Sequence, residues 1–234
     1  MRGSEPLQIV PIQGIGEVSR GDDLGELVLR HGDIRPGDVL VVTSKAVAKA
    51  EDRLVAAPVD DAERESLIAR ESVRVVRRRG SLLITETKHG FVCANAGVDW
   101  SNVESGKVVL LPVDPDGSAQ VIREHLHLEL GFDVPVIVSD TFGRPWRNGV
   151  TDVAIGCAGI QPVLDLRGTL DALGNVLGAT QVCIADEIAA AADLVMGKSS
   201  GVPAAIVRGL SEEVFGDGGA VREIIRQPED DLFR

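Results

Sequence analysis

Acidic and hydroxyl side chains follow strand-like or turn-like segments at three places in the chain. Asp99 lies in the segment AGVDWSN, Asp140 and Thr141 end the segment VSDT, and Asp152 lies in the next TD pair. Ligands of open α/β sheets bind beyond the carboxyl ends of the strands. Hard cations such as Mg²⁺ take carboxylate and hydroxyl oxygens, and phosphates complete their shell. Each aspartate alone is typical of a helix cap or an Asx turn, but the three together favour a divalent-metal site.

Basic side chains lie close to one of these strand ends. Ser44, Lys45 and Lys49 end the apolar run VLVVTSK, and the two lysines are one helical turn apart. A lysine ammonium is a common partner of phosphate, so these residues predict an anion site, with a solvated helix start as the alternative. Arg144 and Arg147 lie close after Asp140 and add positive charge to a polar, glycine-rich segment.

Two segments resemble known phosphate-binding motifs, but each lacks one of the required glycines. Gly14-x-Gly16 lacks the third glycine of a dinucleotide fold, and Gly197-Lys198-Ser199 lacks the first glycine of a P-loop. No Ser/His/Asp or Cys/His arrangement is legible, and the pair His125-x-His127 points to different helix faces. The residues therefore indicate metal-assisted chemistry on a phosphorylated ligand, without a covalent nucleophile from the protein.

The elements that must position these residues alternate between strand and helix patterns, which predicts an α/β architecture. The expected strands are 8–12, 39–45, 81–87, 89–94, 108–111, 134–140 and 203–208. The expected helices are 23–31, 60–79, 118–130 and 185–195. The stretch after Asp140 is expected to be an irregular glycine-rich segment, and the final Leu232-Phe233 predicts a docked terminus.

Composition limits the class of protein. The 234 residues carry a net charge of −12, 44% hydrophobic residues and no tyrosine, so we expect a soluble globular chain with an aliphatic core. The acidity argues against a nucleic-acid partner. No apolar run is long enough to span a bilayer and no signal peptide is visible, so we expect a cytoplasmic protein without a membrane partner. Its three scattered cysteines fit a reducing compartment.

Several long segments resemble one known family. They are IVPIQGIGEV, GDVLVVTSKAVAKAEDRLV, ANAGVDWSN, LLPVDPDGSA, VSDTFGRPWRNGVTDVAIGCAG and ADEIAAAADLVMGK. They resemble the coenzyme F420-0:L-glutamate ligase family over essentially the whole chain, and most of all its actinobacterial form. That form is often fused to a C-terminal nitroreductase-like domain, which this sequence lacks, so it is either a stand-alone ligase or a truncated one.

The resemblance implies a GTP-dependent amide ligase of coenzyme F420 biosynthesis. It adds L-glutamate to coenzyme F420-0 through an acyl phosphate, and then further γ-linked glutamates. The implied cofactors are two Mg²⁺ or Mn²⁺ ions per site, with K⁺ stimulating. The implied structure is a mixed α/β fold of two intimate subdomains, residues 1–234 forming one catalytic domain within an intertwined homodimer.

The resemblance also assigns roles by position. Asp140 and Lys49 match catalytic residues, Asp99 and Asp140 match ligands of the first metal, and Thr141 matches a ligand of the second. The nucleotide contacts are matched by Ile15, Gly16, Glu17, Val18, Ser44, Lys49 and Asn102, with a less secure match at 196–203. Gly16 departs from the proline common in that loop, which leaves the backbone less restricted.

Three other readings stay open. The chain is a related GTP-dependent amide ligase for a different carboxylate, a GTP-binding subunit that needs a nitroreductase-like partner, or a purely structural α/β domain. The set of Asp99, Asp140 and Thr141 argues against the second, and the polar residues at strand ends argue against the third.

Overall fold

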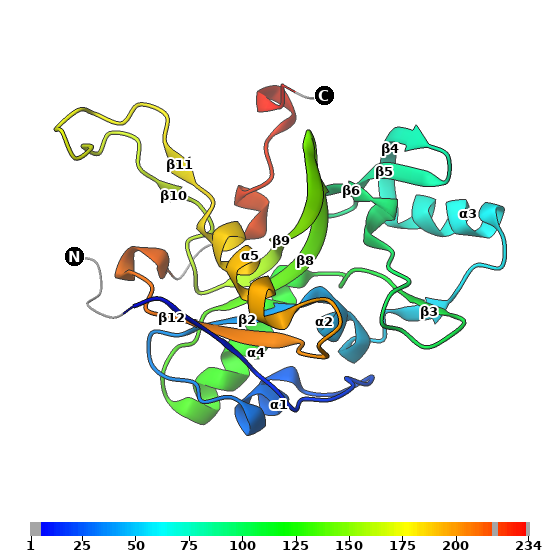
Figure 1. Cartoon of the computed structure of the whole chain (residues 1–234), viewed down its shortest axis with the longest axis horizontal. Helices are drawn as coiled ribbons and strands as arrows, with labels where there is room; N and C mark the ends of the chain where they lie inside the picture. Colours follow the sequence, from blue (N-terminus) through cyan, green and yellow to red (C-terminus); the bar gives the residue numbers. More distant parts are fainter. Residues whose placement is uncertain (1–5, 217–219, 233–234) are drawn as a thin grey trace.

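A five-stranded mixed sheet forms the centre of the computed structural model, which describes residues 6–216 and 220–232. Its strands, in spatial order, are β1 (Gln8–Pro11), β12 (Ala204–Arg208), β2 (Val39–Thr43), β8 (Val136–Arg144) and β9 (Arg147–Ala158). Strands β2 and β8 run parallel, whereas the other neighbours are antiparallel. Strand β2 ends at Thr43 beside Ser139, and β8 continues beyond it to Arg144, so Asp140 and Thr141 lie next to the carboxyl end of β2 (both strands are labelled in Figure 1).

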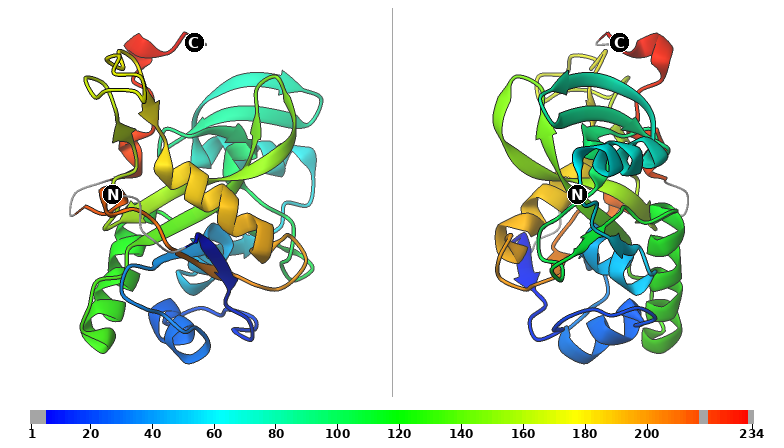
Figure 2. Two further views of the ribbon diagram at one scale, coloured as in Figure 1. Left: turned by 60° about the vertical axis from the view of Figure 1, so that its left-hand side comes forward. Right: turned by 90° about the vertical axis from the view of Figure 1, so that its right-hand side faces the viewer.

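Helices cover both faces of this sheet. Helix α5 (Ile184–Met196) packs on one face, and α4 (Pro115–Leu130) packs on the other with α1 (Leu24–His31) beside it (Figure 2). The main core lies between them and is aliphatic, as predicted. Leu40, Ile137 and Ile206 of the three inner strands are each at most 1% exposed.

A smaller unit lies to one side of the sheet (Figure 1). It contains α3 (Asp61–Glu71), the pair β3 (Leu54–Ala56) and β7 (Lys107–Val109), the antiparallel sheet β4 (Ser72–Arg79), β5 (Leu82–Thr87) and β6 (Val92–Ala94), and the 3-10 turn η1 (Asn95–Gly97). Ile68, Leu83 and Val108 belong to its own cluster of buried side chains. The mixed α/β fold with several sheets is thereby confirmed, and its buried hydrophobic side chains form two separate clusters.

Two further segments extend from the central sheet. An arm containing β10 (Leu164–Asp165) and β11 (Gln181–Val182) projects from the body (Figure 1). Short 3-10 turns follow β12: η2 (Glu212–Val214), η3 (Val221–Glu223) and η4 (Pro228–Asp230). Leu232 is 87% exposed, so the docked terminus predicted there is wrong for this residue, and Phe233 lies outside the described residues.

The junction of β2 and α2 (Ser44–Ala50) differs from the predicted strand 39–45. The strand ends at Thr43, whose hydroxyl accepts from the backbone N–H of Ala46 at 3.4 Å and caps the helix. Polar Ser44 and Lys45 thus leave the buried strand and begin a helix at the sheet edge. Lys45 and Lys49 then lie on the same helix face, as their spacing predicts.

The predicted helix 60–79 is wrong in its second half. Helix α3 ends at Glu71, where Ser72 Oγ donates to the carbonyl of Ile68 at 2.7 Å. The following β4 contains Val73, Val75 and Val76, and β-branched residues favour strands. The arginines of this segment are also common on exposed helices, so the sequence pattern did not distinguish the two structures.

Two other boundaries also shifted. Helix α4 begins at Pro115 and not at Ser118, because Asp114 caps it by accepting from the N–H of Gly117 at 3.1 Å. The segment after Asp140 is not irregular: β8 and β9 pair along their length into a long hairpin. This pairing places Thr141 opposite Asp152.

Candidate active site

A cleft of about 940 Å³ opens at the carboxyl end of β2, beside the middle of β8, between the main sheet and the smaller unit. Its walls include the first turns of α2, the segment 97–104 and the loop 197–203. Of the residues predicted from the sequence, Gly16, Glu17, Val18, Ser44, Lys49, Asp99, Asn102, Asp140 and Thr141 line it. Ile15 does not; its side chain packs against the main core. The predicted residues, far apart in the sequence, are therefore brought together with this one exception.

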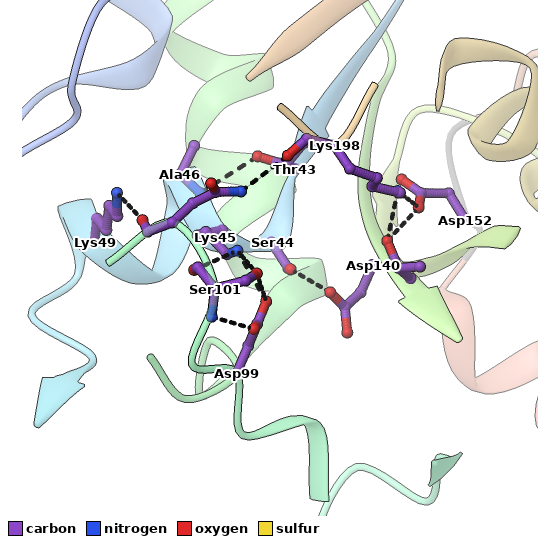
Figure 3. Close-up of polar contacts among 12 residues, drawn as sticks. Thr43, Ser44, Lys45, Ala46, Lys49, Asp99, Ser101, Asp140, Asp152 and Lys198 are labelled. Atoms are coloured by element: carbon purple, nitrogen blue, oxygen red, sulfur yellow. Dashed lines mark hydrogen bonds and ion pairs between the residues drawn. The ribbon is translucent and has the colours of Figure 1, made fainter. Parts of the chain in front are cut away.

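Asp140 is the most perturbed carboxylate of the cleft. Its Oδ1 accepts a hydrogen bond from Ser44 Oγ at 2.8 Å, which joins the first residue of α2 to β8 (Figure 3). Burial raises the pKa of Asp140 to about 6, and repulsion from Asp152 and Asp99 adds to that rise against the Ser44 hydrogen bond. The charges of Asp152 and Asp99 thus act on Asp140 across the cleft.

Asp99 is instead held in its charged form. Burial alone would raise its pKa. The hydrogen bonds from Lys45 and Ser101 and the positive charge of Lys45 together outweigh burial, so the pKa of Asp99 is lowered. Lys45 Nζ lies 2.8 Å from Asp99 Oδ2, and the backbone N–H of Ser101 donates to Oδ1 at 2.7 Å (Figure 3). The backbone of Asp99 pairs with Val109, which fixes this loop to the smaller unit.

Lys49 places a buried positive charge at the other end of α2. Its side chain is only 8% exposed, forms an ion pair with Glu17, and donates to the carbonyl of Asn102 at 3.1 Å. Asn102 has a positive φ of 52°, a conformation that asparagine tolerates better than most residues. Its Nδ2 donates to the carbonyl of Lys198 at 3.0 Å, so the segment around Asn102 touches the loop 197–203.

A second group of polar residues lies across the cleft on the β8–β9 hairpin. Asp152 is 2% exposed, and it accepts from Ser139 Oγ at 3.0 Å and from Thr141 Oγ1 at 2.6 Å. Lys198 Nζ lies 2.6 Å from oxygens of Asp152, Asp193 and Thr141. Burial lowers the pKa of Lys198, but its two carboxylate partners outweigh burial and leave the pKa raised.

Comparison with known proteins agrees with this geometry. The profile of the F420-0:Gamma-glutamyl ligase family matches residues 14–209. The chain belongs to this family. The sequence is 42% identical to Coenzyme F420:L-glutamate ligase of Methanopyrus kandleri, over the whole of both chains. It is 40% identical to the enzyme of the same name from Methanothermobacter thermautotrophicus, over 97% of this chain and 99% of the relative.

A third protein of that name, from Archaeoglobus fulgidus, is 40% identical over 97% of this chain and 96% of its own. The predicted family is thus confirmed, and with it the prediction of an enzyme, because the family is one of ligases. Within the described residues, no helix is long and apolar enough to cross a membrane.

The donor set suits the hard divalent cations expected in the family. Asp99, Asp140, Thr141 and Asp152 offer only oxygen atoms, which Mg²⁺ and Mn²⁺ prefer. In 6–216 and 220–232, no three His, Cys, Asp or Glu side chains form a ready-made metal cluster. Lysines instead contact Asp99 and Asp152, while burial, together with the charges of Asp152 and Asp99, disfavours the ionised form of Asp140, which a cation would stabilise. The residues present therefore fit such ions.

Some residues that the sequence suggested are not in the cleft, and others were missed. Arg144, Trp146 and Arg147 lie at the exposed end of the β8–β9 hairpin, away from Asp140. The sequence predicts Lys198 only as part of an incomplete P-loop and of the less securely matched nucleotide segment 196–203, and it gives no role to Asp193. The two residues are five positions apart on either side of the end of α5, and no local pattern shows that their side chains meet.

Proposed function

We propose that this protein joins L-glutamate to coenzyme F420-0 and that GTP supplies the energy; its relatives are named coenzyme F420:L-glutamate ligases. The observation that carries this proposal is the cleft itself, where Asp99, Asp140 and Asp152 face Lys45, Lys49 and Lys198. Such a mixture of charges suits two anionic substrates that must approach each other. The family match, which spans the cleft residues, supports the proposal.

The nucleotide is assigned to the side of the cleft that contains Lys49. Gly16, Glu17 and Val18 provide a loop beside it, and Lys49 provides a fixed, desolvated charge for a phosphate. Because Glu17 now neutralises Lys49 and is itself mostly exposed, we expect a phosphate to replace the Glu17 carboxylate at the ammonium. Ser44 and Asn102 are the neighbouring polar contacts.

The proposed reaction has two steps, phosphoryl transfer and then amide formation. An oxygen of the acceptor carboxylate attacks the γ-phosphorus of GTP, the bond to the β-phosphate oxygen breaks, and GDP leaves. The amine of glutamate then attacks the acyl carbon, loses a proton and expels inorganic phosphate. Divalent ions held by Asp99, Asp140 and Thr141 would offset the negative charge of the phosphates. Lys45 and Lys49 provide fixed positive charge near the same atoms.

A covalent enzyme intermediate is not part of this scheme. Cys93 is a thiol that lines the cleft, but burial raises its pKa to about 12, and the nearby Asp140 contributes to that rise. The reactive form of cysteine is the thiolate, so Cys93 stays protonated and inert. The substrate carboxylate itself is the nucleophile.

Mass spectrometry of the acceptor tests the proposal. The protein is incubated with coenzyme F420-0, L-glutamate, GTP, Mn²⁺ and K⁺, and the acceptor is expected to gain one or more glutamyl units with release of GDP. Parallel reactions with ATP, without K⁺ and with Asp140→Ala test the nucleotide, the monovalent ion and the site. GTP hydrolysis with an unmodified acceptor would instead favour a different carboxylate substrate. Light scattering of the same sample tests the expected homodimer.

A further inference from the structure

Lys198 reaches back from the loop after α5 into the cleft. Helix α5 ends at Met196, and Gly197 turns the chain with a positive φ of 63°. The Lys198 ammonium then lies 2.6 Å from Thr141 Oγ1, Asp152 Oδ1 and Asp193 Oδ1 (Figure 3 labels Lys198 and Asp152). An ammonium has three hydrogen-bond donors, so these three oxygens use its full capacity.

This arrangement has the features of an occupied cation position. Three oxygen atoms from β8, β9 and α5 converge on one positively charged atom, and two of the oxygens belong to carboxylates. One of the three, Thr141 Oγ1, is also the hydroxyl that the family resemblance assigns to a second metal ion. A divalent cation and the Lys198 ammonium therefore compete for the same oxygens.

The two sides of this contact differ in how easily they move. The Asp152 side chain is 3% exposed and is also held by Ser139, so it stays in place. The Lys198 side chain is 51% exposed and lies on a loop, so it can swing into solvent without unpacking the core. The lysine is thus the removable partner.

We infer that the Lys198 ammonium occupies the position of the second divalent cation when no ligand is bound, and that it must leave this position before a second ion binds. This inference rests on the proposed function, because it presumes that divalent ions bind in the cleft. The lysine keeps Asp152 compensated when no ion is present, since a buried carboxylate without a partner is costly. It also makes binding of the second ion depend on a movement of the Lys198 side chain.

The loop that contains Lys198 also contacts the other side of the cleft. The carbonyl of Lys198 accepts from Asn102 Nδ2 at 3.0 Å, and Asn102 in turn contacts Lys49 through its own carbonyl. The backbone of Lys198 thus contacts the side of the cleft assigned to the nucleotide, while its ammonium lies at the position considered for the second ion.

Mn²⁺ binding to the purified, nucleotide-free protein tests the inference. Free Mn²⁺ is followed by electron paramagnetic resonance during a titration of wild type, Lys198→Met, Lys198→Arg and the control Lys88→Met, whose exposed lysine lies outside the cleft. Methionine keeps the length of the stem without the charge. We expect a second Mn²⁺ to bind Lys198→Met about tenfold more tightly or better than wild type, because a competing charge is removed from the site.

The other variants separate charge from structure. Lys198→Arg keeps the charge and is expected to resemble wild type, as is Lys88→Met. Without metal, Lys198→Met is expected to melt below wild type, and Mn²⁺ is expected to raise its Tm more than that of wild type. Equal or weaker second-site binding in Lys198→Met, or tighter binding in Lys198→Arg as well, would overturn the inference.

The glutamylation assay keeps this inference distinct from the proposed function. If the wild type glutamylates coenzyme F420-0 but Mn²⁺ titrations of wild type and Lys198→Met coincide, only the role of Lys198 is wrong. If the wild type modifies no acceptor while Lys198→Met gains the second Mn²⁺, the proposed reaction is wrong and the inference about Lys198 stands.

Discussion

Replacement of Asp140 by asparagine is expected to stabilise the metal-free protein while it removes activity. Asparagine has the shape of the carboxyl group and still accepts from Ser44, but it carries no charge. In the wild type, burial and the neighbouring Asp152 and Asp99 raise the pKa of Asp140 from 3.8 to about 6. The ionised side chain is therefore less favourable in the folded protein than in the unfolded chain.

The size and sign of this effect follow from linkage. A raised carboxyl pKa means that the folded state binds the proton more tightly, so stability falls as the pH rises from about 4 to about 6 and stays lower above that. At about 1.4 kcal/mol for each pH unit, the loss at neutral pH is at most about 3 kcal/mol. For a chain of this length, each kcal/mol changes Tm by about 2–4 °C.

Thermal unfolding with a chelator present measures the effect. We expect Asp140→Asn to melt several degrees above wild type at pH 7.5, and the difference to shrink towards zero by pH 4.5. Mn²⁺ at pH 7.5 is expected to raise the Tm of wild type and to leave that of the variant nearly unchanged. The control Asp171→Asn makes the same change of charge in the arm, where hydrogen bonds from Asn175 lower the pKa of Asp171, and it is expected to lower Tm slightly.

A lower Tm of Asp140→Asn at pH 7.5, or a difference from wild type that does not vary with pH, would refute the reasoning. Either result would mean that the ionised form of Asp140 is not disfavoured in the folded, metal-free protein. The argument for a cation at this place would then lose its main physical support.

Three further outcomes are expected. Lys49→Met removes a charge-assisted contact of about 1.5–3 kcal/mol, so calorimetry is expected to show GTP binding weakened at least tenfold. The carboxylate of Asp38 is 1% exposed and accepts from Arg208 at 2.7 Å. Arg208→Met leaves it without this partner, and chemical unfolding is expected to show a free energy of unfolding lower by about 3–5 kcal/mol. Gly156→Ala places a Cβ 2.3 Å from the carbonyl of Pro115, where β9 meets α4, and is expected to cost about 1–3 kcal/mol or more and to lower the yield of folded protein.

Matched variants check these outcomes. Arg30→Met breaks an exposed ion pair within α1 and is expected to change stability by less than about 1 kcal/mol. Gly178→Ala adds a Cβ with no heavy atom within 4 Å and is expected to fold normally. Unchanged GTP affinity in Lys49→Met would remove Lys49 from the nucleotide site, and wild-type stability of Arg208→Met or Gly156→Ala would contradict the packing described.

Local patterns predicted the inner part of the fold well, because burial on both faces leaves a clear signal. The runs around Leu40 and Ile137 are apolar throughout, and both form inner strands of the sheet. Strands that mix charge with β-branched residues were missed, as in β4, because each arginine there also suits an exposed helix. The β8–β9 hairpin was missed because its pairing depends on contacts between segments and on glycines within the strands.

The site shows the same division. Asp99, Asp140 and Lys49 were predicted because each follows a recognisable segment, and the family resemblance assigned their roles. Asp152 was noted as a carboxylate near a turn, but only the register of the hairpin, which puts it opposite Thr141, shows that it faces the cleft. Lys198 and Asp193 meet across the end of a helix, and no local pattern encodes where a loop turns back.

The lysines of the cleft explain how an acidic protein keeps such a site folded without its ligands. Burial raises the pKa of Asp140, and the rise is increased by repulsion from Asp152 and Asp99. Lys45 and Lys198 compensate the charges of Asp99 and Asp152, while no lysine contacts Asp140 among the hydrogen bonds and ion pairs of the described residues. The negative charge of Asp140 therefore has no lysine partner, whereas the charges of Asp99 and Asp152 on either side of it do. If divalent cations bind in the cleft as proposed, the first is expected at Asp140 and the second only after Lys198 has left, so the charges of the chain itself would impose an order on metal loading.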